Sequence, residues 1–270
     1  MAGKISLTKG WRDTRTIAYL TLDTLFWSKK TVFVLLISLI VLGLSVLGRV
    51  ILAFNLVPAA LTSSQIFGIL MSTAILRFLV VFVTLFYGTA LISEEVEGKT
   101  LTYLFTRPIP KPTIMLGKFL ALTWMGSILV MPTVIACYVI LYLGADPGLF
   151  LNDLGALSKD IGILFLAILA YGSFFSVLGA WLKHSILVGL AYTFGWEGFV
   201  AVLPGFTRKL TITHYFQSIF PHGDTLGAIA MLVGERTEPM EAMATLVLLT
   251  AFFLATACLI LREKEFVLEQ

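Results

Sequence analysis

The sequence predicts an all-α fold: a polytopic membrane protein with six transmembrane helices. Hydrophobic residues make up 58% of the chain and charged residues 13%, whereas soluble domains carry about 25% charged residues. A water-soluble fold of 270 residues could not cover this much apolar surface with so few charges. The apolar residues also fall in long runs, and a helix needs about 20 of them to cross roughly 30 Å of hydrocarbon.

Six runs are long enough to cross a membrane, so we expect one transmembrane domain over residues 1–270. The runs cover residues 31–54, 66–92, 118–143, 161–182, 185–205 and 242–261. Spans 1 and 2 thus occupy 31–92 and spans 3 to 5 occupy 118–205. Only Lys183-His184-Ser185 separates the fourth span from the fifth, which predicts a tight turn at one membrane face. An even number of spans places both termini on the same side.

Lysine and arginine predict which side that is, because cytoplasmic loops carry an excess of both. Thirteen of the nineteen lie in segment 1–30, the 93–118 loop, the Lys183 turn and the tail 262–270. The intervening loops hold four: Lys159, Arg208, Lys209 and Arg236. We therefore predict that both termini are cytoplasmic.

Two segments outside the spans have helical patterns. Arg12 to Lys30 resembles an interfacial helix on the cytoplasmic side, with apolar residues on one side of it: Ala18, Leu22, Leu25 and Phe26. The outer loop, 206–241, contains aromatic and apolar residues at helical spacing: Tyr215, Phe216, Ile219 and Phe220. We predict short helices here that lie on the outer interface or dip into it.

The charged stretch SEEVEGKTLTYLFTRPIPKP, which begins at Ser93, connects the second and third spans. Its Gly98-Lys99-Thr100 is similar to the end of a P-loop, G-x-x-x-x-G-K-[ST]. That motif needs a glycine five residues before Gly98, where this chain has Ser93. It also needs an upstream β-strand, whereas a transmembrane helix precedes this stretch. We therefore expect no nucleotide site and no catalytic residue on this chain.

The same stretch has the features of a short amphipathic helix. Ser93 would cap its N-terminus, ahead of a first turn with three acids, Glu94, Glu95 and Glu97. Its apolar residues share one third of the helical wheel: Leu101, Leu104 and Phe105. Pro108 and Pro110 would end the helix. We predict that it lies across the cytoplasmic face and docks against a partner. The alternative, an ordinary solvated loop, does not explain the apolar face.

The segment EEVEGKTLTYLFTRPIPKPTIMLGKF resembles the signature of ABC-2-type permeases, the membrane subunits of type V ABC transporters. The interfacial helix, six spans and long outer loop are similar to that family's layout. The resemblance implies that residues 94–107 form a coupling helix. The residues that match it are Glu94, Glu95, Glu97, Gly98, Thr100 and Leu101. Those that match the return of the coupling loop, 93–117, into span 3 are Pro108, Lys111, Gly117 and Lys118. RPIPKP has a proline pair where many relatives have Ser-Arg, which leaves the end of the helix open.

The resemblance also implies the partners. Two cytoplasmic ATP-binding subunits would hold ATP and Mg, and this chain would bind no cofactor. A second permease subunit, alike or different, would complete the complex in the cell membrane. Export of a hydrophobic or amphipathic molecule is favoured. A net charge of only +3, spread along the chain, argues against nucleic acid.

Arg77 and Glu197 are the informative charges within the spans. A lone charge at mid-bilayer costs at least about 2.5–3.5 kcal/mol, so it usually has a partner or faces a wet cavity. At about 1.5 Å per residue, Arg77 lies roughly 25 Å from Glu94, and Glu197 roughly 21 Å from Lys183. Since these depths are similar, we predict a buried pair, within one subunit or across a dimer seam. The pair could line the substrate path or gate, or it could only fix helix register.

Other features have simpler interpretations. Gly172, Ser176 and Ala180 form a small-residue ridge for helix packing in the fourth span, but whether the neighbour is the same chain or a second copy stays open. His214, His222 and Asp224 match no standard set of metal ligands, so we expect no metal site. The serine residues of the fourth span have no histidine on a facing span for protease chemistry.

Two further functions compete with the permease. A secondary transporter or channel could use Arg77 and Glu197 without ATP, although the halves show neither a paired repeat nor a broken helix flanked by charges. The second competing function is that of a membrane anchor for a cytoplasmic complex. An adjacent reading frame that encodes a Walker A motif would favour the permease. A gene without such a neighbour would favour the secondary transporter.

Overall fold

The computed structural model describes residues 7–54, 62–97, 110–143, 147–200, 206–220 and 237–263. Every element in these ranges is a helix, as the sequence predicts. In chain order they are α1 (Leu7–Phe26), α2 (Lys29–Ala53), α3 (Ser63–Leu70), η1 (Met71–Val80), α4 (Val81–Glu97), α6 (Lys111–Tyr142), α7 (Pro147–Trp181), α8 (Ser185–Leu190), η2 (Ala191–Glu197), α9 (Gly198–Val200), η3 (Phe206–Leu210), α10 (Ile212–Ile219) and α12 (Pro239–Glu263).

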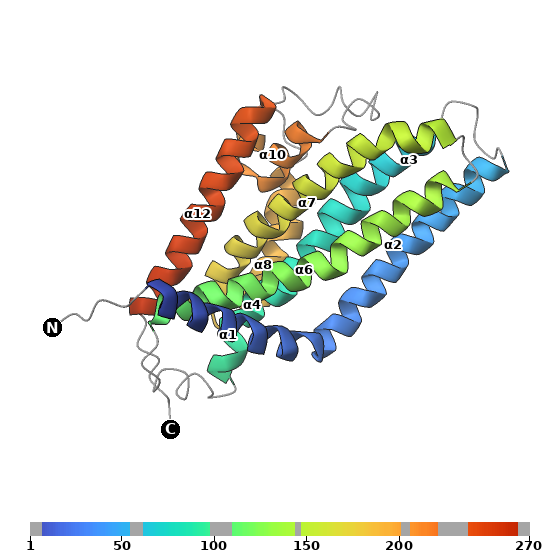
Figure 1. The fold of residues 1–270 in the computed structure, drawn as a ribbon. Helices are drawn as coiled ribbons and strands as arrows, with labels where there is room; N and C mark the ends of the chain where they lie inside the picture. Colours follow the sequence, from blue (N-terminus) through green and yellow to red (C-terminus); the bar gives the residue numbers. More distant parts are fainter. Residues whose placement is uncertain are drawn as a thin grey trace.

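Long helices run side by side in a bundle, and α1 crosses one end of it (Figure 1). Five of the described helices are long and apolar enough to span a membrane: Lys29–Ala53, Ser63–Ser93, Lys111–Tyr142, Gly148–Trp181 and Pro239–Glu263. The second of these joins α3, η1 and α4 into one continuous rod. The structure therefore supports a multi-pass membrane protein.

The predicted fifth span, 185–205, corresponds to a shorter apolar helix, Ser185–Val200. It joins α8, η2 and α9. The described part ends at Val200, so this helix measures about 24 Å at about 1.5 Å per residue. The turn at Lys183 and His184 separates it from α7, as predicted.

Helix ends differ from the predicted ones on both sides of the charged stretch. The second span does not stop before Ser93, because α4 continues through Glu97. The prediction that Ser93 caps a new helix is therefore wrong. Its hydroxyl donates to the Thr89 carbonyl, four residues earlier, at 2.7 Å, which is the bond of a serine inside a helix. On the return, α6 begins at Lys111 rather than at residue 118.

The core is centred on α4 and α7, which approach each other closely at glycines. A Cβ added to Gly179 would lie 2.5 Å from the Thr89 carbonyl oxygen. One added to Gly88 would lie 2.8 Å from the Phe175 Cβ. Of the predicted ridge, Ser176 and Ala180 are buried in the same bundle, and a Cβ on Gly172 would meet the Leu122 side chain of α6 at 2.7 Å. The neighbours of the ridge thus belong to the same chain.

Both ends of the described chain lie at one end of the bundle. Figure 1 shows the start of α1 beside the end of α12, while α10 lies at the opposite end with the start of α12. The end of α4 and the start of α6 also lie at the α1 end (Figure 1). This arrangement agrees with an even number of crossings between α1 and the end of α12.

Candidate functional site

The residues assigned to coupling divide between helix ends and the segment between them. Glu94, Glu95 and Glu97 lie in the last part of α4. Lys111, Gly117 and Lys118 lie on α6. The others fall outside the described residues: Gly98, Thr100, Leu101, Leu104, Phe105 and Pro108. The coupling helix thus stays a prediction, whereas the two helices that would carry it are in place.

Lys118 joins these two helices. Its side chain is 2% exposed, and its Nζ donates to the Leu91 carbonyl of α4 at 2.5 Å. The family resemblance singled out Lys118, but only as part of a motif. The structure adds that its ammonium group connects α6 to α4.

Gly117, the preceding residue, lets α1 cross α6 closely. A Cβ at this position would lie 2.8 Å from the Thr14 carbonyl oxygen and 3.0 Å from the Ile17 Cβ. Among the side chains of α1 that the structure describes, residues 12–26, the buried apolar ones are Ile17, Ala18 and Leu25. Phe26, which we placed on the same side as Ala18 and Leu25, is instead 57% exposed. The apolar face of α1 is thus partly the predicted one, and it packs on the first turns of α6.

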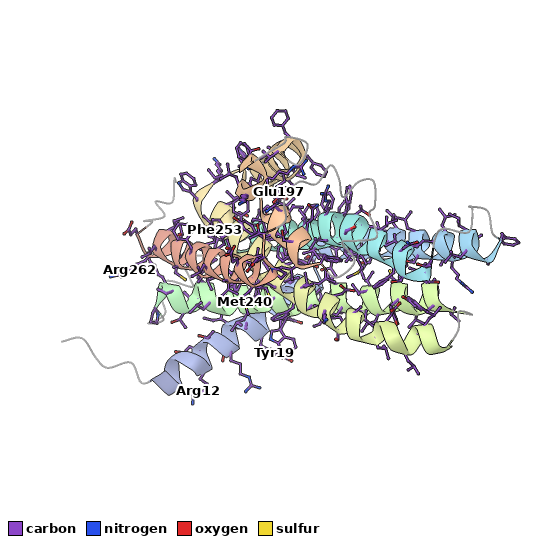
Figure 2. All side chains as sticks on the ribbon, turned by 90° about the horizontal axis from the view of Figure 1, so that it is seen from above. Arg12, Tyr19, Glu197, Met240, Phe253 and Arg262 are labelled. Carbon is purple, nitrogen blue, oxygen red and sulfur yellow. The ribbon has the colours of Figure 1, made fainter. Side chains whose placement is uncertain are left out.

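A further bond connects the end of the last helix to the same region. Lys111, at the start of α6, donates from Nζ to the Arg262 carbonyl near the end of α12, at 3.4 Å. Figure 2 shows Arg262 at the far end of α12. The first two turns of α6 therefore contact α1, α4 and α12 together.

Arg77 and Glu197 line one cavity in the membrane-spanning part. Arg77 lies in η1 and Glu197 in η2, and both of these segments are π-helical. The cavity has a volume of about 160 Å³ and is lined by Arg77, Phe78, Thr193, Phe194, Glu197, Gly198 and Thr213. π-helical segments are rare, and those inserted in α-helices frequently lie at functional sites. Both charges therefore lie at one cavity, while their depth in the membrane stays a prediction.

Hydroxyl groups surround the Glu197 carboxyl group. Thr213 of α10 donates to Oε2 at 2.9 Å, and Tyr171 of α7 donates to the same oxygen at 3.0 Å. Tyr192 of η2 donates to Oε1 at 3.4 Å. Glu197 is 7% exposed and Tyr171 1% exposed. Figure 2 shows Glu197 among the helices, near α10. We call these four residues, Glu197, Tyr171, Tyr192 and Thr213, the hydroxyl cage.

Arg77 is exposed and does not join this cage. Among the described residues, the structure places no carboxylate oxygen within 4.0 Å of a lysine or arginine nitrogen at this cavity, so Arg77 and Glu197 form no salt bridge within the chain. The predicted contact within one subunit is therefore not observed in this conformation. Pairing across a dimer seam stays a prediction.

Aromatic rings continue from the cavity toward α2. Phe82 of α4 contacts Phe78 of η1 and Phe194 of η2, with ring centroids 6.4 and 6.0 Å apart. Phe86 stacks on Phe82 at 5.9 Å, and Phe33 of α2 meets Phe86 edge-on at 5.2 Å. Phe33, Phe78 and Phe194 are 47%, 48% and 54% exposed. We call these five rings the phenylalanine wall. It is an apolar surface that begins at Arg77.

The outer-loop helix is observed where the sequence predicts one. α10 is amphipathic and buries Phe216 completely against Tyr171, at 6.0 Å between ring centroids. Its Thr213 reaches the hydroxyl cage. His214 is also buried, and its Nε2 lies 3.1 Å from the Thr237 hydroxyl. Burial lowers the pKa of His214, and the charges of Lys209 and Arg208 lower it further. α10 therefore dips into the bundle.

Sequence reasoning missed the three hydroxyl donors. Tyr171 and Tyr192 count as apolar in a hydrophobic run, and Thr213 lies 16 residues beyond Glu197 in the chain. A buried acid in a span should have prompted a search for hydroxyl partners as well as for a cation. Of the three residues weighed and set aside as metal ligands, His214, His222 and Asp224, the last two lie outside the described residues. The described residues contain no cluster of three His, Cys, Asp or Glu side chains.

Comparison with known proteins gives one family. The model described as "ABC-2 family transporter protein" matches residues 28–265, from the start of α2 to the end of α12. No curated protein sequence matches the chain. The match includes both helices that flank the predicted coupling segment and every residue of the cavity. The chain belongs to the ABC-2 transporter family, the multi-pass membrane components of ABC transporters.

Proposed function

We propose that this chain is the permease subunit of an ATP-driven exporter, and that a separate cytoplasmic subunit hydrolyses the ATP. The observation that carries the proposal is the family match over residues 28–265, since the members of that family are membrane components of ABC transporters. Two ATP-binding subunits would supply ATP and Mg. The permease would bind neither, because its Gly98-Lys99-Thr100 lacks the first glycine of a P-loop.

In this proposal the chain crosses the cell membrane six times. Segment 185–205, which includes the helix Ser185–Val200, would supply the fifth crossing. The excess of lysine and arginine at the α1 end of the bundle supports cytoplasmic termini. α4 ends and α6 begins at the same end (Figure 1), so a coupling segment between them would face the ATP-binding subunits.

The contacts around α6 explain how a push on the coupling segment would spread. Because the Lys118 ammonium group binds the Leu91 carbonyl, α4 and α6 would move together. Because α1 lies against Gly117 without space for a methyl group, it would follow α6. α4 continues through η1 to the cavity, so motion at the coupling segment would reach Arg77 along a single rod. ATP binding would shift the balance between inward-closed and outward-open conformations.

The cavity at Arg77 and Glu197 would form part of the substrate path or gate. Arg77 and the phenylalanine wall are exposed on the single chain, and a charge in that position needs a wet cavity or a partner. A second permease subunit, identical or different, facing this surface would enclose the path.

The proposal is tested by Leu104→Asp in the complex with its ATP-binding subunit. This change places a charge on the predicted apolar face, so we expect loss of transport and loss of permease-dependent stimulation of ATP hydrolysis, with membrane insertion retained. Thr102→Asp, on the opposite side of the same predicted helix, is the matched control and should retain both. Unchanged ATPase stimulation in Leu104→Asp, or failure of the purified chain to bind any ATPase, would contradict the proposal.

A further inference from the structure

We infer that the cavity between η1 and η2 binds the anionic headgroup of an amphiphile, with Arg77 as its charge partner. This inference rests on the proposed function, because it names the chemical class of substrate for the proposed path. The headgroup would be a phosphate or a carboxylate, and the apolar part of the molecule would lie along the phenylalanine wall.

The first step of the argument is the charge of Arg77. A guanidinium is always protonated in proteins, and leaving it without an anion inside a bilayer costs at least about 2.5–3.5 kcal/mol. Among the described residues, no carboxylate lies within salt-bridge distance of Arg77. Its side chain lines the cavity and is exposed. An anion that enters the cavity would therefore meet an available guanidinium whose planar fork matches phosphate and carboxylate.

The second step is that Glu197 does not neutralise Arg77. Both of its carboxyl oxygens accept hydrogen bonds from the hydroxyl cage: Oε2 from Thr213 and Tyr171, and Oε1 from Tyr171 and Tyr192. Two of these donors come from α7 and α10, so the carboxyl group is held toward those helices. The cavity thus has an acid that is already hydrogen-bonded and an arginine that is not.

The third step is the shape and polarity of the walls. A volume of about 160 Å³ is several times the ~30 Å³ that a water molecule occupies in the liquid, so a phosphate or carboxylate headgroup fits. Phe78 and Phe194 line the same cavity and contact Phe82, which continues the apolar surface toward α2. A polar end beside an apolar surface is the form that selects an amphiphile over a free inorganic anion.

The test measures binding to the purified permease alone, in neutral maltoside micelles, by titration calorimetry. Dodecyl phosphate is the anionic probe, and dodecyltrimethylammonium is the cationic probe of the same chain length. We expect dodecyl phosphate to bind more tightly than the cation, and Arg77→Gln to weaken it about ten- to hundredfold, the usual range for one hydrogen bond to a charged group. Arg77→Lys retains the charge but not the planar fork, so it should bind dodecyl phosphate more tightly than Arg77→Gln and less tightly than the unmodified protein.

Arg49→Gln is the matched control. Arg49 also lies within a span, on α2, but it does not line the cavity. This variant should bind dodecyl phosphate as the unmodified protein does, which would exclude a general effect of charge on partition into the micelle. Thermal unfolding of each variant shows whether it is folded, and Arg77→Lys provides a folded comparison if Arg77→Gln unfolds.

A second arm distinguishes a membrane lipid from a diffusing amphiphile. The permease in nanodiscs containing phosphatidic acid, and then in nanodiscs of phosphatidylcholine alone, is titrated with dodecyl phosphate. If phosphatidic acid competes, the headgroup of a lipid occupies the site. If it does not compete while dodecyl phosphate still binds, the site takes a single-chain amphiphile. Both results support an anion site at Arg77.

Two results would overturn the inference. One is equal binding of dodecyl phosphate by Arg77→Gln and by the unmodified protein. If Arg77→Gln also separates a permease dimer while binding stays equal, Arg77 serves the contact between subunits and not an anion site. The other is equal affinity for the cationic probe. The titrations contain no ATPase, so their results are independent of the Leu104→Asp experiment. If Leu104→Asp uncouples ATP hydrolysis but Arg77 binds no anion, only the inference is refuted. If Arg77 binds the anion but Leu104→Asp has no effect, only the proposed function is refuted.

Discussion

Gly179→Ala tests the close contact between α4 and α7 on which the bundle is centred. The added Cβ would lie 2.5 Å from the Thr89 carbonyl oxygen, 2.9 Å from the Thr89 Cα and 3.0 Å from the Gly88 carbonyl oxygen. All three are backbone atoms, so no side chain can rotate away. Ordinary contacts begin at 3.4 Å, and the two helices would therefore have to separate by almost 1 Å at this point.

The expected cost follows from a control on the same helix. A Cβ on Gly162 of α7 meets nothing within 4 Å. Both substitutions gain the preference of alanine over glycine in a helix, about 1 kcal/mol, and this gain cancels when the two variants are compared. The remaining difference is the cost of overpacking, typically about 1–3 kcal/mol. We expect Gly179→Ala to be less stable than Gly162→Ala by that amount.

The assay is equilibrium unfolding in mixed micelles with increasing dodecyl sulfate, followed by circular dichroism. The two variants and the unmodified protein are measured at the same detergent composition, so that the midpoints are comparable. Equal midpoints for Gly179→Ala and Gly162→Ala would refute the close packing of α4 on α7. A lower midpoint for Gly162→Ala than for Gly179→Ala would refute it as well.

Two further predictions concern single side chains. Lys118→Met nearly retains the length of the side chain but removes its hydrogen bond to Leu91, so we expect permease-dependent ATPase stimulation to fall severalfold. Lys183→Met, at an exposed turn, is the control and should leave this stimulation unchanged. Equal ATPase rates in the two variants would contradict the role of Lys118. Burial lowers the pKa of His214, so the unfolded chain binds a proton at this imidazole more readily than the folded chain does. The free energy of unfolding should therefore be highest above the usual histidine pKa of about 6.5 and fall as the pH drops below it. Unfolding midpoints between pH 7.5 and 5 should show this loss, and His214→Gln should reduce it; an identical pH dependence in the variant would show that other groups cause it.

Much of the fold could be predicted because apolar runs of the length of a bilayer leave few alternatives to helices. The α10 helix was equally predictable from the spacing of Tyr215, Phe216 and Ile219. The ends of the helices were less predictable from the sequence. α4 passes through Ser93 and α6 starts at Lys111, because a helix can continue beyond the hydrocarbon, where hydropathy no longer reports on it.

The site was predictable only in part, since its groups come from separate helices. Arg77 and Glu197 could be found because charges are rare within spans. Tyr171 and Tyr192 could not, because a tyrosine inside an apolar run gives no indication that its hydroxyl meets an acid. Gly88 and Gly179 were missed for a related reason: the contact between α4 and α7 depends on their relative rotation. The predicted small-residue ridge lies on the correct helix, but it included Ala180 and not the neighbouring Gly179, which approaches the α4 backbone most closely.

The π-helical turns at η1 and η2 have a consequence for how the bundle could change shape. A π turn contains an extra residue compared with an α turn, and one residue corresponds to about 100° of rotation in a 3.6-residue helix. If η1 changed from the π to the α form, the residues before it would rotate about the helix axis relative to the residues after it. The continuous helix of α3, η1 and α4 would keep its backbone hydrogen bonds. Arg77, which lies within η1, would then point in a different direction relative to η2.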